Sequence, residues 1–284
     1  MAEQKPDERE VVAKHYAGVD HQAGPAIYTR ADVFDAIFDL GRFRDLPRDT
    51  KSLVVDLMSG VKCLVASEVK KRADKEGIPL DVHCYDIAFG KLPEAERKKL
   101  EAQGYVLGSG DITQGTGYET GRFHRATARF GVKNYQRDEQ IGIFREVKRI
   151  LVPEEYFVLV DMETPETSYE WVQTERRRKS RHTVGEENAH HHIPTREMWF
   201  EMLKEAGLEP NKDDVYVTKS FVATTNWVTS KQMTEDGRKG MDTFLLDAPL
   251  RARQDFNIRE EEGVDSKKVV KIDYPVVVIA SKAI

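Results

Sequence analysis

The chain has 284 residues and a nearly balanced charge, with 44 Lys+Arg against 49 Asp+Glu. No field of one sign steers it toward DNA or an anionic membrane, so a nucleic acid is not expected as a partner. No apolar run approaches the roughly 20 residues of a membrane span, and residues 1–10 are polar. We expect a cytoplasmic protein without a membrane span, in which Cys63 and Cys84 are reduced thiols.

Two predicted helices precede the first strand. The first covers residues 8–16, and the second begins near Thr29 and carries Val33, Ile37 and Leu40 at helical spacing. We expect residues 1–50 to form an N-terminal helical cap.

Strands and helices then alternate along the chain. Short apolar, β-branched runs predict strands, and the segments between them have helical spacing. The predicted order is strand 53–56, helix 63–75, strand 82–86, helix 93–103 and strand 105–107. Such alternation is typical of a parallel sheet that is covered by helices on both faces.

Each of these three strands runs into an aspartate, namely Asp56, Asp86 and Asp111. In a parallel sheet, ligands bind beyond the carboxyl ends of the strands, so we expect these carboxylates to converge on one cleft. Several fixed acceptors favour a ligand that is rich in hydroxyl and amino donors. Any one of the three, taken alone, is equally typical of a turn or a helix cap.

The second half of the chain continues the pattern and ends in a predicted strand pair. Strands are predicted at 125–130 and 156–160, on either side of a helix at 138–150. A polar stretch at 163–188 is too long for an ordinary loop, and a helix is expected at 195–206. Strands near 215–224 and 275–280 are expected to close the sheet as a hairpin pair.

We expect one core made of residues 51–225 plus 272–284, interrupted by an insertion at 226–271. Long excursions inside a compact domain are usually lids or binding segments, so the insertion is a candidate wall for a substrate pocket. The open alternative is a solvated flap or an oligomer contact, and a homodimer is compatible with the sequence.

Three segments resemble a known family. They are RFHRATARFGVKN at 122–134, FREVKRILVP at 144–153 and YFVLVD at 156–161. They resemble the class I S-adenosylmethionine-dependent methyltransferases, and most closely the ubiquinone/menaquinone C-methyltransferase branch, in which a Phe-Gly-Leu-Arg-Asn segment follows the fourth strand. The resemblance implies a Rossmann-like α/β fold: a mostly parallel seven-stranded sheet with helices on both faces, an antiparallel C-terminal hairpin and insertions that form a lid.

The resemblance gives the three aspartates separate roles toward the cofactor, S-adenosyl-L-methionine. Asp86 would accept both ribose hydroxyls, and Asp111 would accept the adenine amine. Asp56 would hold the methionine end through the loop that follows it. The other residues implied to bind the cofactor, with the two isoleucines on the faces of the adenine ring, are Gly60, Ile87, Ile112, Arg129 and Phe130.

The loop after the first strand departs from the family's pattern. The family usually has Asp-x-Gly-x-Gly-x-Gly or Asp-x-x-Gly-Gly-x-Gly there, because glycines let the backbone turn tightly and approach the cofactor. This chain has DLMSGVK at 56–62, in which Met58 and Lys62 occupy positions that often hold glycine. Lys62 either pairs with the cofactor's carboxylate or crowds the site.

Methyl transfer from a sulfonium is an in-line displacement. The enzyme contributes alignment, desolvation and, where the nucleophile carries a proton, a general base. The candidate catalytic residues are His15, Tyr16, His191 and His192. Tyr16 resembles the tyrosine of the family's N-terminal Lys-Tyr-Asp-like segment, with Ala17 in place of the aspartate. The triple histidine at 190–192 also suggests a metal, but consecutive side chains point apart and we expect no metal site.

The sequence therefore predicts a methyltransferase that uses S-adenosyl-L-methionine and acts on a small organic molecule at carbon or oxygen. The alternative is a protein that binds this cofactor for other chemistry, as a cyclase or rearrangement catalyst, or a non-catalytic binding module. The glycine-poor loop at 58–62 motivates this alternative.

Overall fold

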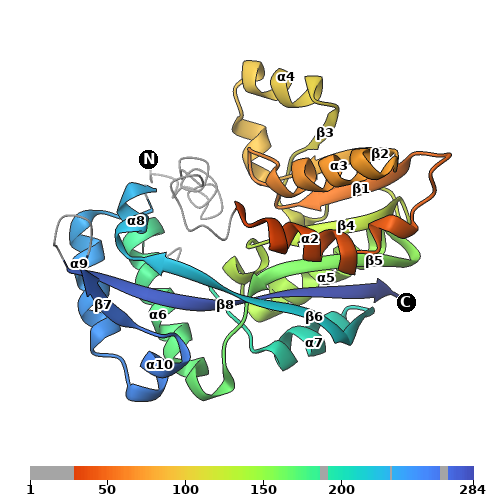
Figure 1. The fold of residues 1–284 in the computed structure, drawn as a ribbon. Coiled ribbons are helices and arrows are strands. Elements are labelled where there is room, and N and C mark those ends of the chain that lie inside the picture. Colours follow the sequence, from red (N-terminus) through yellow and green to blue (C-terminus); the bar gives the residue numbers. More distant parts are fainter. Residues whose placement is uncertain (1–28, 186–190, 231, 263–267) are drawn as a thin grey trace, which may run out of the picture. The chain divides into compact units, whose positions relative to one another are not determined.

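A computed structural model describes residues 29–185, 191–230, 232–262 and 268–284 (Figure 1). The helix predicted at 8–16 lies outside these residues. The chain divides into two compact units, which we call the larger and the smaller unit. The larger unit comprises Ala31–Asp161, Arg196–Val217 and Val277–Ile284, and the smaller unit includes Met162–Thr195 and Thr218–Val276.

Within the described part of the chain, eight strands form one sheet. Seven of them follow the order β3-β2-β1-β4-β5-β8-β6, and the short β7 pairs with β8. The strands from β3 to β5 along this order are parallel, as predicted. The bounds are β1 Ser52–Leu57, β2 Leu80–Tyr85, β3 Tyr105–Gly108, β4 Phe123–Arg129, β5 Leu151–Met162, β6 Leu208–Ala223, β7 Arg259–Glu262 and β8 Lys268–Ala283.

The last two long strands are the predicted C-terminal pair. The neighbouring strands β6 and β8 run in opposite directions (Figure 1). Both are much longer than the apolar runs that predicted them, because each continues beyond its apolar stretch into polar sequence.

Alternate residues of the parallel strands face two separate layers of helices in the larger unit. On one face, Leu57, Ala128 and Leu159 join a buried cluster with residues of α5 (Arg137–Ile150) and α7 (Arg196–Glu205). On the other face, α3 (Leu64–Glu76) contacts β1 and β2, and α2 (Ala31–Leu40) packs against α3. The predicted Rossmann-like architecture with helices on both faces is therefore confirmed.

Local sequence sets the ends of these helices. α5 begins with a capping box, in which the Glu139 side chain accepts from the backbone N–H of Gln136 at 3.1 Å. α3 ends at Gly77, whose φ of 70° lies in the left-handed region that favours glycine. The remaining helical elements of the larger unit are η2 Phe43–Asp45, η3 Ile87–Lys91, α4 Glu94–Ala102, η4 Ile112–Gln114 and η5 Val132–Asn134.

The smaller unit is mainly helical. The polar stretch predicted at 163–188 contains α6 (Tyr169–Val184), and the predicted insertion at 226–271 is partly helical. The insertion's role as a lid or contact stays a prediction. The other helical elements of this unit are η6 Glu166–Ser168, α8 Thr225–Thr229, α9 Glu235–Leu246 and α10 Leu250–Asp255. Across the described ranges, no helix has the length and apolar character needed to cross a membrane.

Candidate functional site

The three predicted aspartates lie at the same edge of the sheet in the larger unit. Asp56 is the next-to-last residue of β1, Asp86 follows β2 directly, and Asp111 lies three residues after β3. The strands are parallel and in register, with Asp56 opposite Cys84 and Tyr85 opposite Gly108. The geometry therefore brings these residues to one edge, where ligands of parallel sheets bind.

Asp86 connects two loops at this edge. One carboxylate oxygen accepts the N–H of Ala88 at 2.8 Å and so caps η3, and the other accepts the N–H of Gly60 at 2.9 Å. Burial raises the pKa of Asp86, while these two backbone donors lower it. A carboxylate has about four lone-pair sites, so Asp86 is able to accept two further donors such as a pair of vicinal hydroxyls.

Asp56 faces the helix layer rather than the strand end. Its side chain is 1% exposed, accepts the Thr127 hydroxyl at 2.8 Å, and accepts the N–H of Ala66 in the first turn of α3 at 3.3 Å. Burial raises its pKa to about 7, against the opposing effects of Thr127, Arg129 and Ala66. Asp56 can thus influence a ligand only through the loop and helix that it fixes.

Asp111 and the two isoleucines have different surroundings. One Asp111 oxygen accepts both the N–H and the hydroxyl of Thr113, each at 2.9 Å, and so caps η4. Ile112 is 2% exposed and belongs to the buried cluster, whereas Ile87 is only partly buried. Ile87 is therefore the better placed of the two to contact a ligand ring.

The loop from Met58 to Cys63 keeps a glycine-like backbone without the glycines. Met58 has a φ of 52°, in the left-handed region, at a position where the resembling family often has glycine. Its side chain occupies the space beside Gly131, because a Cβ added there would lie 2.6 Å from the Met58 Sδ. Gly60, with a φ of 63°, has no described atom within 4 Å of such a Cβ, so open space adjoins the loop at that point.

Arg129 is the last residue of β4, and Phe130 follows it beside this loop. The Arg129 guanidinium carbon lies 5.6 Å from the Phe130 ring centroid. Phe130 has a φ of 56° and donates its N–H to the carbonyl of Val160 at 2.8 Å. The backbone N–H of Lys133 then donates to Asp161 at 3.1 Å, so the segment after β4 is tied to the end of β5.

Asp161 is a residue of this edge that the sequence reasoning did not assign. It is fully buried near the end of β5, and its second carboxylate oxygen lies 3.6 Å from the Lys133 ammonium. The signal was present, since Asp161 ends an apolar strand as Asp56 and Asp86 do. It holds the segment that contains Phe130 in place.

The candidate catalytic histidines lie in the smaller unit, and the candidate cofactor residues lie in the larger one. The Tyr169 hydroxyl is 2.9 Å from Nε2 of His192, and the Ser180 hydroxyl is 3.1 Å from Nε2 of His191. His15, Tyr16 and His190 are outside the described residues. The assignment of a general base stays a prediction.

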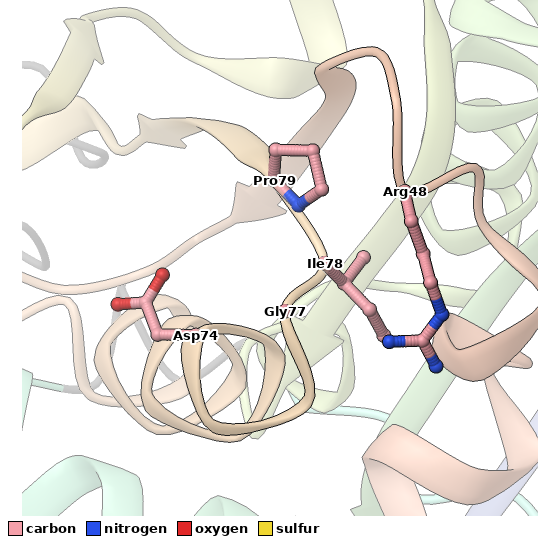
Figure 2. Close-up of a pocket in the computed structure, with 5 residues that line it drawn as sticks. All are labelled: Arg48, Asp74, Gly77, Ile78 and Pro79. Carbon is pink, nitrogen blue, oxygen red and sulfur yellow. The ribbon is translucent and has the colours of Figure 1, made fainter.

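A surface hollow of about 290 Å³ lies elsewhere, at the end of α3 (Figure 2). It is lined by Arg48, Asp74 and 77–79, and the Arg48 guanidinium donates to the carbonyl of Glu76. Pro79 directly precedes β2, so the hollow adjoins the opposite end of this strand from Asp86. Among the residues that the structure describes, no three His, Cys, Asp or Glu side chains are grouped to hold a metal ion.

No protein-family model matches the chain, and no curated protein matches its sequence significantly. Solved structures do match. YcgJ of Bacillus subtilis is 15% identical, over 89% of this chain and 98% of its own, with a TM-score of 0.68. A candidate methyltransferase of Bacillus halodurans is 19% identical, over 86% and 98% of the two chains, with a TM-score of 0.65.

A third match is the geranyl diphosphate C-methyltransferase of Streptomyces coelicolor, solved with Mg²⁺, geranyl diphosphate and S-adenosyl-L-homocysteine. It is 11% identical, over 100% of this chain and 86% of its own, with a TM-score of 0.52. These likenesses show that the chain has the Rossmann-like fold of such methyltransferases.

Proposed function

We propose that this protein is a methyltransferase that transfers the methyl group of S-adenosyl-L-methionine to carbon or oxygen of a small organic molecule. The observation that carries the proposal is the position of Asp86, at the carboxyl end of β2 with one oxygen on the Gly60 loop and acceptor capacity left for a ligand. The fold, which the chain shares with structures of methyltransferases, supports the same reading.

The residues at this edge fit an adenosyl group. Asp86 would accept the two ribose hydroxyls, because two backbone N–H groups hold its carboxylate in place and the residue is only partly buried. Asp111 and Ile87 would contact the adenine, the first through its carboxylate and the second through its partly buried side chain. Gly60, with open space beside it, would lie against the methionine end, and Asp56 would support that loop from behind.

Arg129 and Phe130 complete the proposed cofactor site from β4, and Ile112 supports it from the core. When bound, the cofactor supplies an electrophilic methyl on a sulfonium. The chain would hold this group in line with the acceptor and exclude water from it. Where the acceptor carries a proton, a general base is also needed, and its assignment among His15, Tyr16, His191 and His192 stays a prediction.

The alternative function is binding of the same cofactor for non-methylating chemistry, or without catalysis. Met58 favours it, since its side chain stands where the resembling family often has none and it packs against Gly131. A bulky residue in this loop changes the pose of the methionine end before it changes the adenosine contacts. Binding would then persist while methyl transfer is lost.

A product assay separates the two functions. The full chain is incubated with S-adenosyl-L-methionine and a panel of acceptors, and the release of S-adenosyl-L-homocysteine is measured. Quinone precursors come first in the panel, because segment 130–134 resembles the ubiquinone/menaquinone branch. Release that depends on one acceptor supports the methyltransferase. Cofactor binding with no release from any acceptor supports the alternative, and the absence of binding contradicts both.

A further inference from the structure

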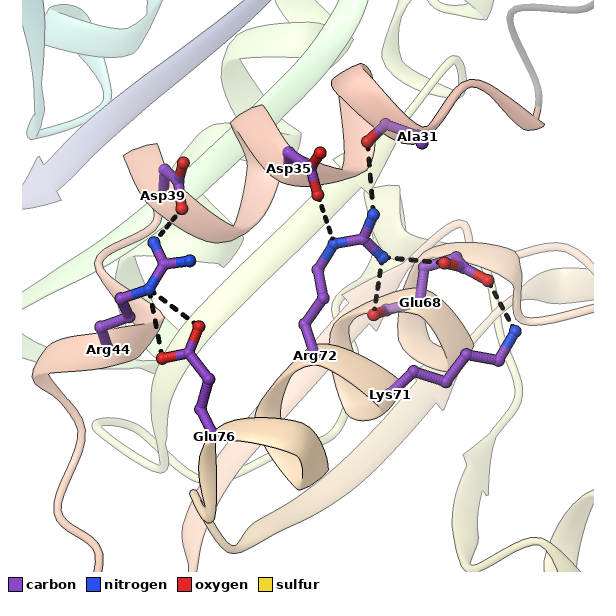
Figure 3. A network of polar contacts seen from close by, with 8 residues as sticks. All are labelled: Ala31, Asp35, Asp39, Arg44, Glu68, Lys71, Arg72 and Glu76. Atoms are coloured by element: carbon purple, nitrogen blue, oxygen red, sulfur yellow. Dashed lines mark hydrogen bonds and ion pairs between the residues drawn. The ribbon is translucent and has the colours of Figure 1, made fainter.

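Helix α2 is attached to α3 by a network of polar contacts (Figure 3). Arg72 of α3 donates to the Asp35 carboxylate at 2.9 Å, to the carbonyl of Ala31 at 3.3 Å and to the Glu68 carboxylate at 2.8 Å. The Arg72 side chain is 19% exposed and that of Asp35 is 63% exposed, so the bonds converge on a largely buried guanidinium while the Asp35 carboxylate still faces solvent. The first turn of α2 is therefore held in a defined place on α3.

This attachment fixes Phe34, which lies between Ala31 and Asp35 in the sequence and points inward. Phe34 is 3% exposed. Two guanidinium groups lie over its ring, with the Arg72 carbon 5.7 Å and the Arg129 carbon 5.6 Å from the centroid. One aromatic ring thus contacts both the arginine that anchors α2 and the arginine that ends β4.

Arg129 is the member of this group that belongs to the proposed cofactor site. It also lies over the Phe130 ring, at 5.6 Å, and it is close enough to buried Asp56 to lower the pKa that burial raises. A guanidinium held against two rings is weakly hydrated and keeps its plane fixed. Less side-chain freedom is then lost when a ligand binds beside it.

We infer that Phe34 is a positioning residue of the cofactor site, and that α2 acts on the bound cofactor by holding the guanidinium of Arg129 at the end of β4. The inference rests on the proposed function. It assigns to α2 a role in affinity that is separate from its contribution to stability.

The same helix offers a matched control. Phe38 is also fully buried and has the Arg44 guanidinium carbon 5.1 Å from its ring centroid, but its other ring partner is Phe43, not Arg129. Phe34→Leu and Phe38→Leu each replace a buried ring on α2 by a similar apolar side chain. We expect comparable losses of stability from the two changes.

Their effects on cofactor binding are expected to differ. S-adenosyl-L-homocysteine is titrated into each full-length variant by calorimetry. Phe34→Leu should weaken binding about fivefold to tenfold, the size expected for the loss of one cation–π contact, and Phe38→Leu should change it less than about twofold. If Phe34→Leu does not fold, Phe34→Met, whose flexible side chain fills a similar volume, takes its place.

A double-variant cycle shows whether Phe34 acts through Arg129. In an Arg129→Ala background, Phe34→Leu should weaken binding by less than about twofold more. An equal loss for Phe34→Leu and Phe38→Leu, no loss for Phe34→Leu, or a full loss in the Arg129→Ala background would overturn the inference while leaving the proposed function intact. Failure of the unaltered protein to bind would overturn both.

Discussion

The free energy of unfolding is expected to depend on pH through the buried carboxylate of Asp56. Burial raises the pKa of Asp56 from 3.8 to about 7. The folded protein therefore binds this proton more tightly than the unfolded chain does. Protonated Asp56 therefore contributes to the stability of the folded state. This contribution is complete below pH 3.8 and is lost progressively as the pH rises through about 7.

The size of the effect follows from the interval between the two pKa values. Each pH unit in this interval changes the free energy of unfolding by about 1.4 kcal/mol. The interval from 3.8 to about 7 then corresponds to about 4 kcal/mol. Solvent screening does not reduce this figure much, because the Asp56 side chain is only 1% exposed.

The test compares Asp56→Asn with the unaltered protein. Asparagine does not titrate, and its carbonyl oxygen can still accept the Thr127 hydroxyl that Asp56 accepts at 2.8 Å. Urea unfolding is followed by circular dichroism from pH 4 to pH 8. The variant should gain up to about 4 kcal/mol relative to the unaltered protein over this range.

The control is Asp213→Asn, which changes an exposed aspartate of β6. It should change the free energy of unfolding by less than about 0.5 kcal/mol. A difference between Asp56→Asn and the unaltered protein that is constant from pH 4 to pH 8 would refute the argument. It would mean that the carboxylate has another compensating partner.

Two further changes test the loop and the helix contact. Gly131→Ala places a Cβ 2.8 Å from the Cβ of Met58, so it should lower the free energy of unfolding by about 1–3 kcal/mol. In a Met58→Gly background the loss should be clearly smaller. An equal loss in both backgrounds would show that Met58 is not the obstacle. Arg72→Gln replaces the guanidinium that donates to α2 by a shorter amide that does not reproduce its contacts, and it should cost about 1–2 kcal/mol. Lys71→Gln changes a side chain that is 67% exposed and should cost less than about 0.5 kcal/mol. Similar losses for Arg72→Gln and Lys71→Gln would contradict the anchoring of α2 by Arg72 that Figure 3 shows.

Most of the larger unit could be predicted because its signals are local. The apolar runs of β1, β2 and β5 end in carboxylates, and α5 has apolar residues at helical spacing. The direction of Asp56 could not be predicted in the same way. Asp56 lies on the α3 side of β1, and only the packing of α3 shows that the Asp56 carboxylate is enclosed and not presented to a ligand.

Helix α6 shows where hydrophobic periodicity fails. Its buried face includes charged residues. One oxygen of the buried Glu175 accepts the Tyr274 hydroxyl at 2.9 Å, and the other lies 3.0 Å from Nε of Arg176 in an ion pair. A sequence rule that searches for apolar residues every three or four positions does not recognise such a helix. Tyr274 is 99 residues away from Glu175 in the sequence, so local periodicity does not register this contact.

The loop after β1 shows a different limit. The sequence reveals that Met58 stands where glycine is common in the resembling family, but not how the backbone responds. The structure keeps the left-handed φ of 52° at Met58 and makes room for its side chain at Gly131. The compensating glycine lies in another loop, so this pairing depends on tertiary contact.

Calorimetric titration of the full chain with S-adenosyl-L-methionine and S-adenosyl-L-homocysteine tests whether the protein binds this cofactor through Asp86. Asp86→Ala removes the proposed ribose acceptor and the contact to Gly60, and it should weaken binding about tenfold or more. Asp81→Ala, at the other end of β2, should leave the affinity within about twofold. One binding site per chain with this pattern is the predicted result, whereas no binding of either compound at millimolar concentration, or equal affinities for the two variants, would contradict the account.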